Sequence, residues 1–341
     1  MDNSHASRPG GRVTMGLITA ITRRLGQAVV LLFVMSLIGF IGIHSVGNPV
    51  FNIVNMETAT VEDIRNATIA LGLDQPLWQQ YLIFVKSLLT GSFGTSYIYH
   101  LPAFSLVLTK LPATLELASA AMLIAAPGGI LLGLIAGRRQ GSLIDRIILR
   151  SSVFAISVPA FWLSMVLILV GAVMMGWFPS GGRGDTTRMF GVEWSFLTAN
   201  GLKHLVLPAL SLAIPNIALI ARLARAGTVE VESHDFIRFC RAKGLSSGRI
   251  LFRHTLPNIS VPIVTVIGLQ FGAMLAFAVV VETIFAWPGV GKLLIDSIQL
   301  LDRPVVMATL TFVSVTFVVL NALVDLFHAF IDPRIRHSSQ R

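Results

Sequence analysis

Six long apolar stretches alternate with polar segments along this chain of 341 residues. Each stretch is close to the length of about 20 residues that an α-helix needs to cross the hydrocarbon core of a bilayer. The pattern therefore predicts an all-α integral membrane protein with six transmembrane helices. The predicted spans cover about residues 25–43, 113–135, 153–175, 205–223, 259–281 and 305–330.

The polar segments between the predicted spans differ in length and character. Residues 1–22 are rich in Ser, Gly and Arg, which predicts a disordered cytoplasmic N-terminal extension. It precedes a transmembrane domain that covers residues 23–336. Within this domain, residues 47–112 are expected to form a long external loop and residues 224–258 a long cytoplasmic loop. Residues 337–341 are a C-terminal tail.

Local signals refine three of these segments. The stretch from Val61 to Leu71 predicts an amphipathic helix that is capped by Thr60, with acidic residues in its first turn. Pro159 predicts a kink in the third span. The glycine-rich run Ser180–Gly184 neither follows a strand nor carries the Lys-Ser/Thr pair of a phosphate-binding loop, so it predicts a flexible external loop.

The distribution of basic residues indicates the orientation in the membrane. Of the 26 Lys and Arg residues, 18 lie in segments that are cytoplasmic if both termini are cytoplasmic, and 8 lie in the external segments. Because positive charge is retained on the cytoplasmic side, both termini are predicted to be cytoplasmic. The same placement accounts for the net charge of +9 without a nucleic-acid partner, since the basic residues flank apolar runs.

Composition and motifs exclude several classes of protein. With 54% hydrophobic and 13% charged residues, the chain is not a soluble domain. The single cysteine, Cys240, excludes an intramolecular disulfide and a cysteine-cluster metal site. The sequence has no HExxH or GxSxG motif. The run from Ala286 to Lys292 mimics a nucleotide-binding loop, but it has Ala286 in place of the first Gly and Leu293 in place of Ser or Thr.

Two acidic residues, Glu116 and Asp325, are expected near membrane depth. A charge there suggests an ion or proton path, as in a secondary transporter, which would also need an inverted repeat that is not clear in this sequence. The alternative places Glu116 at the external interface and Asp325 near the cytoplasmic one, each paired or snorkelling, and we favour it. An intramembrane protease is a further class, but Ser157 and Ser164 have no His at comparable depth.

One cytoplasmic loop, within residues 221–262, holds seven of the 26 basic residues. Inside it, the run from Asp235 to Gly244 predicts a short amphipathic helix that Gly244 ends in a left-handed conformation. A second helical turn follows from Ser246, and Pro257 marks the return to the membrane. Two protruding helices with an apolar face need a cytoplasmic partner. The apolar positions of the first are Phe236, Ile237, Phe239 and Cys240.

This loop resembles the EAA loop of ABC importer permeases, in the variant found in the dipeptide/oligopeptide permease family with its glutathione and nickel branches. The resemblance is carried by Phe236–Leu245, Arg253–Asn258 and Pro262. With Gly244 as the anchor, Leu256 and Pro257 match the pattern, and Arg238, Phe239 and Cys240 stand in place of Glu-Ala-Ala. Further matches to the family are Val281–Lys292, Leu73–Trp78, Gly91–Gly94 and Asp332–Arg336.

Membership of this family would imply the type I importer permease fold in a bacterial cytoplasmic (inner) membrane. It implies a non-catalytic transport subunit without a cofactor of its own, with ATP and Mg bound on partner ATPase subunits. The implied partners are a second homologous permease subunit, two ATP-binding subunits, an extracytoplasmic substrate-binding protein and membrane lipid, with no nucleic acid. Dipeptides or oligopeptides are the expected solutes, and glutathione, nickel chelates or opine-like compounds are the alternatives.

The resemblance also implies which residues couple the chain to the ATPase subunits. They all lie in the basic cytoplasmic loop. They are Asp235, Phe236, Arg238, Phe239, Cys240, Arg241, Ala242, Lys243, Gly244, Leu245, Arg253, His254, Leu256 and Pro257.

Overall fold

The computed structural model describes residues 59–331, together with residues 26, 29–42, 44, 47, 49, 50 and 54. Side chains are described as far as residue 319, except those of residues 276 and 277. The predicted N-terminal extension, the C-terminal tail and the side chain of Asp325 therefore lie outside the described residues.

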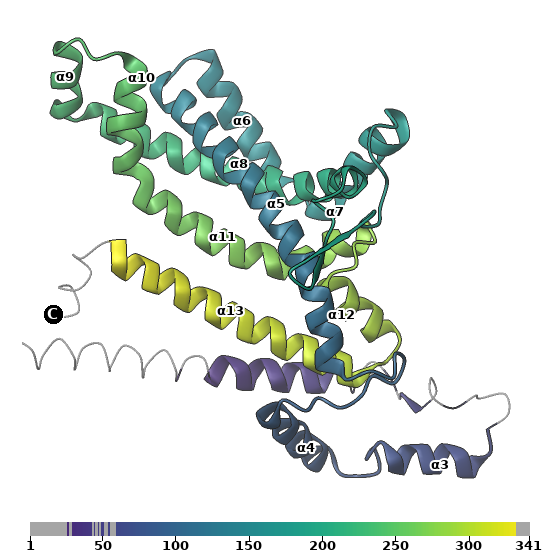
Figure 1. Ribbon diagram of the computed structural model, residues 1–341. Coiled ribbons are helices and arrows are strands. Elements are labelled where there is room, and N and C mark those ends of the chain that lie inside the picture. The colour runs from purple at the N-terminus through teal and green to yellow at the C-terminus, as the bar shows by residue number, and fades with distance from the viewer. Residues whose placement is uncertain are drawn as a thin grey trace, which may run out of the picture.

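Long helices form an elongated bundle (Figure 1). They are α5 (Ala103–Arg138), α8 (Ala199–Ser233), α11 (Leu256–Ile284) and α13 (Arg303–Ile331). One continuous cluster of buried apolar side chains joins α5, α8 and α11, with Leu117, Ile220 and Ile263 among its fully or almost fully buried members. Lipid tails are as apolar as these side chains, so close van der Waals packing, and not removal from water, is the main term that holds the three helices together in a membrane.

Three helical segments of the described chain have the length and apolar composition to cross a membrane, and a fourth is added if one bent pair counts as a single span. The three are Ala103–Arg138, Ala199–Ser233 and Ser247–Leu275. Two shorter apolar helices, Val29–Gly42 and Arg303–Val319, overlap the first and last predicted spans. Helices thus occupy all six predicted stretches, while the count of six crossings and the side of each terminus stay predictions.

The third apolar stretch is divided between two helices that meet at Pro159. α6 (Leu143–Ser157) ends before this proline, and α7 (Ala160–Leu167) follows it and continues into the π-helix η1 (Ile168–Met174). The two arms are bent by 105°. Val158 is extended, with ψ of 125°, because the ring of Pro159 disfavours helical geometry in the residue before it. The predicted kink is confirmed, and it breaks the helix completely.

Glycines bring α5 and α8 into close contact. Gly129, Gly133 and Gly137 are spaced one turn apart on α5, and all three are buried. A Cβ atom on Gly133 would lie 2.5 Å from the carbonyl oxygen of Ala221, and one on Gly137 would lie 2.6 Å from the Cβ atom of Thr228. No larger residue fits at these positions, so the two backbones pack directly against each other.

Two helices lie in the predicted external loop, where the sequence predicted one. α3 (Val61–Ala70) begins at Thr60, which forms a reciprocal capping box with Asp63. The side-chain and backbone hydrogen bonds from Thr60 hold the pKa of Asp63 below its ordinary value. α4 (Leu77–Thr90) was not predicted, and its Tyr81 and Phe84 pack against Phe40 of the first apolar helix.

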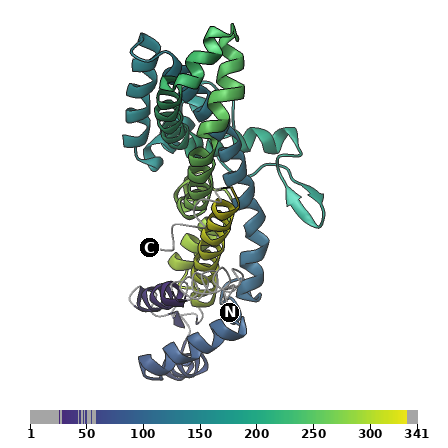
Figure 2. The ribbon, with the colours of Figure 1, turned by 90° about the vertical axis from the view of Figure 1, so that its left-hand side faces the viewer.

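A short antiparallel hairpin precedes α8. β1 (Thr187–Met189) pairs with β2 (Val192–Trp194) so that Arg188 lies opposite Glu193. Both residues of the turn have positive φ angles, 54° for Phe190 and 80° for Gly191, which is typical of a type I′ turn. Figure 2 shows the hairpin projecting away from the long helices, and Phe190 at its tip is 93% exposed.

Short helices complete the chain. α9 (Asp235–Ala242), α10 (Ser247–Ile250) and the π-helix η2 (Leu251–Thr255) connect α8 to α11. α12 (Val290–Gln299) connects α11 to α13. In Figure 1, α9 and α10 lie at the opposite end of the bundle from α12. The fold therefore separates the basic loop from the segment that follows α11.

Candidate functional site

The predicted coupling residues form a compact helical segment. α9 ends just before Gly244, whose φ of 73° confirms the expected left-handed conformation. The N–H groups of Gly244 and Leu245 donate to the carbonyls of Arg241 and Cys240, which satisfies acceptors at the end of the helix. The chain then turns into α10, as the second helical turn from Ser246 predicted.

The apolar residues of α9 lie on two different faces. Ile237 is fully buried, and Cys240 packs beside it against the main apolar cluster. Phe236 and Phe239 point away from the bundle and are 42% and 60% exposed. The sequence assigned all four to one apolar face. Residues three apart lie close together on a helix, so Phe236 pairs with Phe239 and Ile237 pairs with Cys240, on two neighbouring strips of α9. One pair anchors α9 to its own chain, and the other is free to contact a partner.

One basic side chain lies over an exposed phenylalanine, and two others on α9 are paired with acidic residues. The ammonium group of Lys243 lies 4.5 Å from the centroid of the Phe239 ring. Arg241 donates to Glu232 at 2.6 Å, and Arg238 lies 3.2 Å from Asp235. Surface pairs of this kind contribute only about 0–1 kcal/mol each, so they add little stability. Lys243 is therefore the one basic neighbour of the exposed rings that these contacts show, while Arg238 and Arg241 are paired with acidic residues of this chain.

The other predicted coupling residues follow the chain back to α11. Ala242 and Arg253 are exposed, and His254 is half-buried. Leu245 and Leu256 pack against the main apolar cluster, and Pro257 lies in the first turn of α11. The structure therefore brings the predicted residues together in one segment, and their role in coupling stays a prediction.

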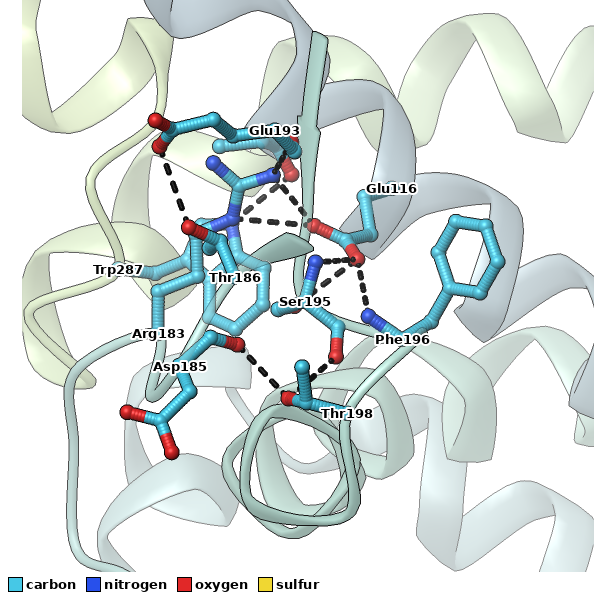
Figure 3. Close-up of polar contacts among 10 residues, drawn as sticks. Glu116, Arg183, Asp185, Thr186, Glu193, Ser195, Phe196, Thr198 and Trp287 are labelled. Carbon is cyan, nitrogen blue, oxygen red and sulfur yellow. Dashed lines mark hydrogen bonds and ion pairs between the residues drawn. The ribbon is translucent and has the colours of Figure 1, made fainter. Parts of the chain in front are cut away.

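A second polar site joins the hairpin loop to α5 (Figure 3). Glu116, on α5, is only 4% exposed. Its Oε2 accepts from Nη2 and Nε of Arg183, at 2.6 Å and 3.0 Å. Its Oε1 accepts from the N–H and hydroxyl of Ser195, at 2.8 Å and 2.9 Å, and from the N–H of Phe196 at 2.7 Å. The buried carboxylate is thus fully paired, which favours the paired alternative over an ion path.

The glycine-rich run of residues 180–184, predicted to be a flexible loop, is instead fastened to the bundle. The N–H of Gly182 donates to the carbonyl of Phe285 at 2.7 Å. The guanidinium of Arg183 lies near the ring of Trp287 (Figure 3), at 5.8 Å from the ring centroid. The indole N–H of Trp287 donates to the carbonyl of Ala113, at 2.8 Å, on α5. The loop, α5 and the segment after α11 are therefore held together.

A second buried carboxylate, that of Glu282, lies close to the same turn of α5. Its Oε1 accepts from the hydroxyl of Thr114 at 2.6 Å, and its Oε2 accepts from the N–H of Lys292 at 3.0 Å. The N–H of Val290 donates to the Thr114 hydroxyl at 2.8 Å. The two side chains satisfy N–H groups at the beginning of α12, where a negative charge also interacts favourably with the helix dipole.

Sequence reasoning missed Glu282, because it considered the run Val281–Lys292 only as a family match and a defective nucleotide-binding loop. Lys292 pairs with Asp296 on its own helix, at 2.6 Å. The available signal was a carboxylate shortly before the helix start Gly289-Val-Gly, where free N–H groups need acceptors. We call Ala113, Thr114, Glu116 and the groups bonded to them the α5 junction.

A cavity of about 150 Å³ borders the α5 junction, between α5, α11, α12 and α13. We call it the α11–α13 cavity. Its walls are largely apolar. They include Thr114, Leu275, Val279, Val290, Leu294 and Val313.

The two sites are suited to binding a partner and to holding helices together. Among the residues that the structure describes, no three or more His, Cys, Asp or Glu side chains are grouped to hold a metal ion. Glu116 and Glu282 are both occupied by hydrogen-bond donors. The geometry suits a protein that binds partners at α9 and holds its helices in register at the α5 junction.

Comparison with known proteins gives matches along almost the whole chain. Residues 129–337 match the family described as "Binding-protein-dependent transport system inner membrane component", and residues 17–118 match the corresponding N-terminal family. The chain is 39% identical over 336 residues to the di/tripeptide transport system permease protein of Pseudomonas aeruginosa (strain UCBPP-PA14), with 94% of this chain and 99% of that protein covered.

Two proteins from Escherichia coli (strain K12) have sequence identities to this chain that are only slightly lower. The dipeptide transport system permease protein is 35% identical over 339 residues, with 94% of this chain and 99% of that protein covered. The glutathione transport system permease protein is 35% identical over 322 residues, with 94% and 100% covered. The three relatives therefore match 94% of this chain over almost their own full length.

Solved structures give weaker similarity. The methionine ABC transporter MetNI in inward-facing conformations aligns with a TM-score of 0.45 and 17% identity, over 69% of this chain and 97% of that chain. An amino acid ABC transporter with histidines aligns with a TM-score of 0.46 and 18% identity, over 66% of this chain and 94% of that chain.

Proposed function

The chain belongs to the family of binding-protein-dependent transport system inner membrane components, and on this premise we propose that it is the permease subunit of an ATP-driven importer of di- and tripeptides. A permease of this family works in the membrane with a substrate-binding protein and with ATPase subunits. In the finer form of the proposal, one homologous permease chain and two ATPase subunits complete the complex, and ATP and Mg bind to the ATPase subunits.

The assignment of peptides as the solute is based on sequence identities of 39% and 35% to two peptide permeases, over 94% of this chain. Each of the two alignments covers 94% of this chain. The peptide proposal is therefore supported by the whole chain, and does not depend on one motif.

Glutathione import is the second candidate. The glutathione permease of Escherichia coli is 35% identical, the same value as for the dipeptide permease of that strain. Glutathione is itself a tripeptide, with a γ-linked first residue. The two candidates therefore differ in the peptide linkage that the complete complex accepts.

Uptake by intact cells tests the proposal. Uptake of radiolabelled dialanine, trialanine and glutathione is compared between cells of the source strain with the gene deleted and the same cells complemented with the gene. We expect saturable, ATP-dependent uptake of the α-linked peptides only when the gene is present. If glutathione alone shows gene-dependent uptake, the second candidate replaces the first. If none of the three does, peptide import by this chain is refuted.

In the proposed complex, α9 is the segment that seats on an ATPase subunit. Phe236 and Phe239 form its exposed apolar centre, and Lys243 lies over the Phe239 ring. Aromatic side chains surrounded by polar groups are typical of the residues that dominate binding at protein interfaces. The inner pair of Ile237 and Cys240 fixes α9 to the bundle, so a movement of the ATPase subunit would be passed to α8.

The coupling proposal is tested by placing negative charges in the apolar centre. The double variant Phe236→Glu, Phe239→Glu should insert normally but lose the ATPase subunits during purification and lose uptake, because each exposed ring would be replaced by a carboxylate. Phe190→Glu is the matched control, since this residue is also exposed but lies on the hairpin. Normal ATPase retention by the double variant would show that α9 is not the docking segment.

A further inference from the structure

α4 begins at the level where two apolar helices reach the predicted external side. These are the first apolar helix, Val29–Gly42, and α13. Near the beginning of α4, Oε1 of Gln80 lies 2.9 Å from Nε2 of His44, which follows the first apolar helix by two residues. Nη1 of Arg303, the first residue of α13, lies 3.2 Å from the same nitrogen. The start of α4 is therefore fixed to the external ends of both helices.

From this level, α4 descends along the two helices. The Tyr81 hydroxyl lies 3.0 Å from the Ser36 hydroxyl on the first apolar helix. Leu88, two turns further along α4, lines a small cleft together with Leu32 and Ser314. Ser314 is eleven residues beyond the start of α13, which is about 16 Å along the helix. The far end of α4 therefore lies deep in the outer half of a hydrocarbon core about 30 Å thick.

The chain then returns to the side from which it came. α4 ends at Gly91, which has a left-handed conformation with a φ of 67°. Shortly afterwards, the hydroxyl of Ser96 and the N–H of Tyr97 both donate to the carboxylate of Asp302, which lies directly before α13. The 14 residues of α4 span only about 21 Å, which is too short to cross the membrane. This path is that of a re-entrant helix.

Polar groups at the deep end of α4 are bonded locally. The hydroxyls of Ser87 and Thr90 donate to backbone carbonyls of α4, at 2.7 Å and 3.0 Å. The N–H of Gly91 donates to the carbonyl of Leu88 at 3.3 Å. The N–H of Ser92 donates to the carbonyl of Ser87 at 3.0 Å. Hydrocarbon offers no water to replace such partners, so these bonds suit a helix end surrounded by acyl chains.

The outward strip of α4 is apolar and is not covered by the described part of the chain. Trp78, Leu82 and Leu89 are 61%, 56% and 80% exposed, and their spacing of four and seven residues places them on one side of the helix. Trp78 is at the external end, where aromatic residues meet the headgroups, and Leu89 is at the deep end. Lys86 is exposed on the same strip. Its stem leans toward the helix N-terminus, and so leads the ammonium group toward the headgroups.

Two observations favour lipid over a protein as the partner of this strip. Phe33 of the first apolar helix is 55% exposed, and its ring lies 6.4 Å from that of Tyr81, so the exposed apolar surface continues from that helix onto α4. Lys86 lies within the strip, and Lys is depleted at protein interfaces. Lipid accommodates it, because a Lys that extends to the headgroups keeps its charge out of the hydrocarbon.

We propose that α4 is a re-entrant helix embedded in the outer leaflet, with acyl chains against Leu82 and Leu89 and with Trp78 and the ammonium group of Lys86 at the headgroups. One segment of the predicted external loop, residues 47–112, is then inside the bilayer. It holds the first apolar helix and α13 together from the lipid side. The inference concerns the membrane surface of the chain and does not depend on which solute is transported.

The test measures the depth of spin labels in lipid nanodiscs that contain the complete complex. Cys240 is replaced by Ala, and a nitroxide is attached to Leu82→Cys, to Leu89→Cys or, as the control, to Glu62→Cys on α3, which is exposed. Power saturation compares collisions with O₂, which concentrates among acyl chains, and with a water-soluble nickel chelate. The ratio of O₂ to nickel collisions should be several-fold higher at Leu89 than at Glu62, with Leu82 between them.

Three results would overturn the inference. A ratio at Leu89 as low as that at Glu62 means that α4 lies in water. Low collision rates with both reagents at Leu82 and Leu89 mean that a protein covers the strip. Equal ratios at Leu82 and Leu89 mean that α4 lies flat on the membrane surface. None of these measurements involves uptake, so they are distinguishable from a failure of the proposed function.

Discussion

The hydroxyl of Thr114 joins three helices, because it donates to Glu282 at 2.6 Å and accepts from the N–H of Val290 at 2.8 Å. Thr114 lies on α5, Glu282 near the end of α11 and Val290 at the start of α12. All three residues are buried. One hydroxyl therefore determines how these helices meet next to the α11–α13 cavity.

Removal of this hydroxyl should destabilise the protein. Thr114→Val keeps the shape of the side chain but leaves the Val290 N–H without an acceptor and removes one donor from Glu282. A buried polar group left unsatisfied costs about 1–3 kcal/mol. We expect a lower midpoint in thermal unfolding of the detergent-solubilised complex. Thr114→Ser retains the hydroxyl and should stay close to wild type. Equal midpoints for the Val and Ser variants would contradict the assigned role.

Truncation of Glu116 should release the hairpin loop. Glu116→Ala leaves the guanidinium of Arg183 and the N–H groups of Ser195 and Phe196 without their acceptor. Breaking a buried ion pair on one side costs about 3–5 kcal/mol. We therefore expect faster cleavage near residue 188 by trypsin in the assembled complex. Glu62→Ala is the control, because Glu62 is an exposed carboxylate on α3, outside the hairpin loop. Cleavage at the wild-type rate in Glu116→Ala would show that the loop is held by other contacts.

Substitution of Gly244 should uncouple transport from ATP hydrolysis. An added Cβ meets no atom within 4 Å at Gly244 or at Gly248, but only Gly244 has a positive φ. A β-branched residue at Gly244 is therefore strained by its backbone conformation alone, by about 1–2 kcal/mol or more. Relief of this strain would reorient α9.

We expect Gly244→Val to lose uptake and retain less ATPase subunit on co-purification, whereas Gly248→Val should be milder in both assays. Because the space around the two positions is the same, their comparison separates backbone conformation from crowding. If Gly244→Val transports normally with its ATPase subunits attached, α9 does not couple the two processes.

Labelling of introduced cysteines tests the orientation that the charge distribution predicts. Phe190→Cys, at the exposed tip of the hairpin, should react with a membrane-impermeant thiol reagent added to intact spheroplasts. Gly248→Cys, in open space in the basic loop, should react only after permeabilisation. The half-buried native Cys240 is replaced by Ala in both variants, so that only the introduced cysteine reports. Labelling of Gly248→Cys in intact spheroplasts would reverse the predicted topology.

Features that depend on neighbouring residues could be predicted from the sequence. The capping box at Thr60, the break at Pro159 and the left-handed Gly244 are all local consequences of the residue type and its immediate context. The apolar stretches were likewise visible because membrane-length helices need long apolar runs.

Features that depend on distant contacts could not be predicted. Glu282 is held by Thr114, which lies 168 residues earlier, and the glycine-rich loop is fastened through Gly182 to the carbonyl of Phe285. The hairpin was missed because each of its strands has three residues, too few for an alternating pattern. For α9, helical spacing predicted the apolar residues, but only the packing on the bundle separates Phe239 from Cys240.

The glycine stripe on α5 has a consequence for the stiffness of the whole chain. Gly133 and Gly137 place two backbones in direct contact, with no side-chain torsions between them to absorb a displacement. α8 ends at Ser233, directly before α9, and α5 carries the α5 junction. A force applied to α9 would therefore pass first into this closely packed pair of helices, and from α5 toward the hairpin loop and the first turn of α12. Deformation is left to the segments outside this pair of helices, such as the break at Pro159.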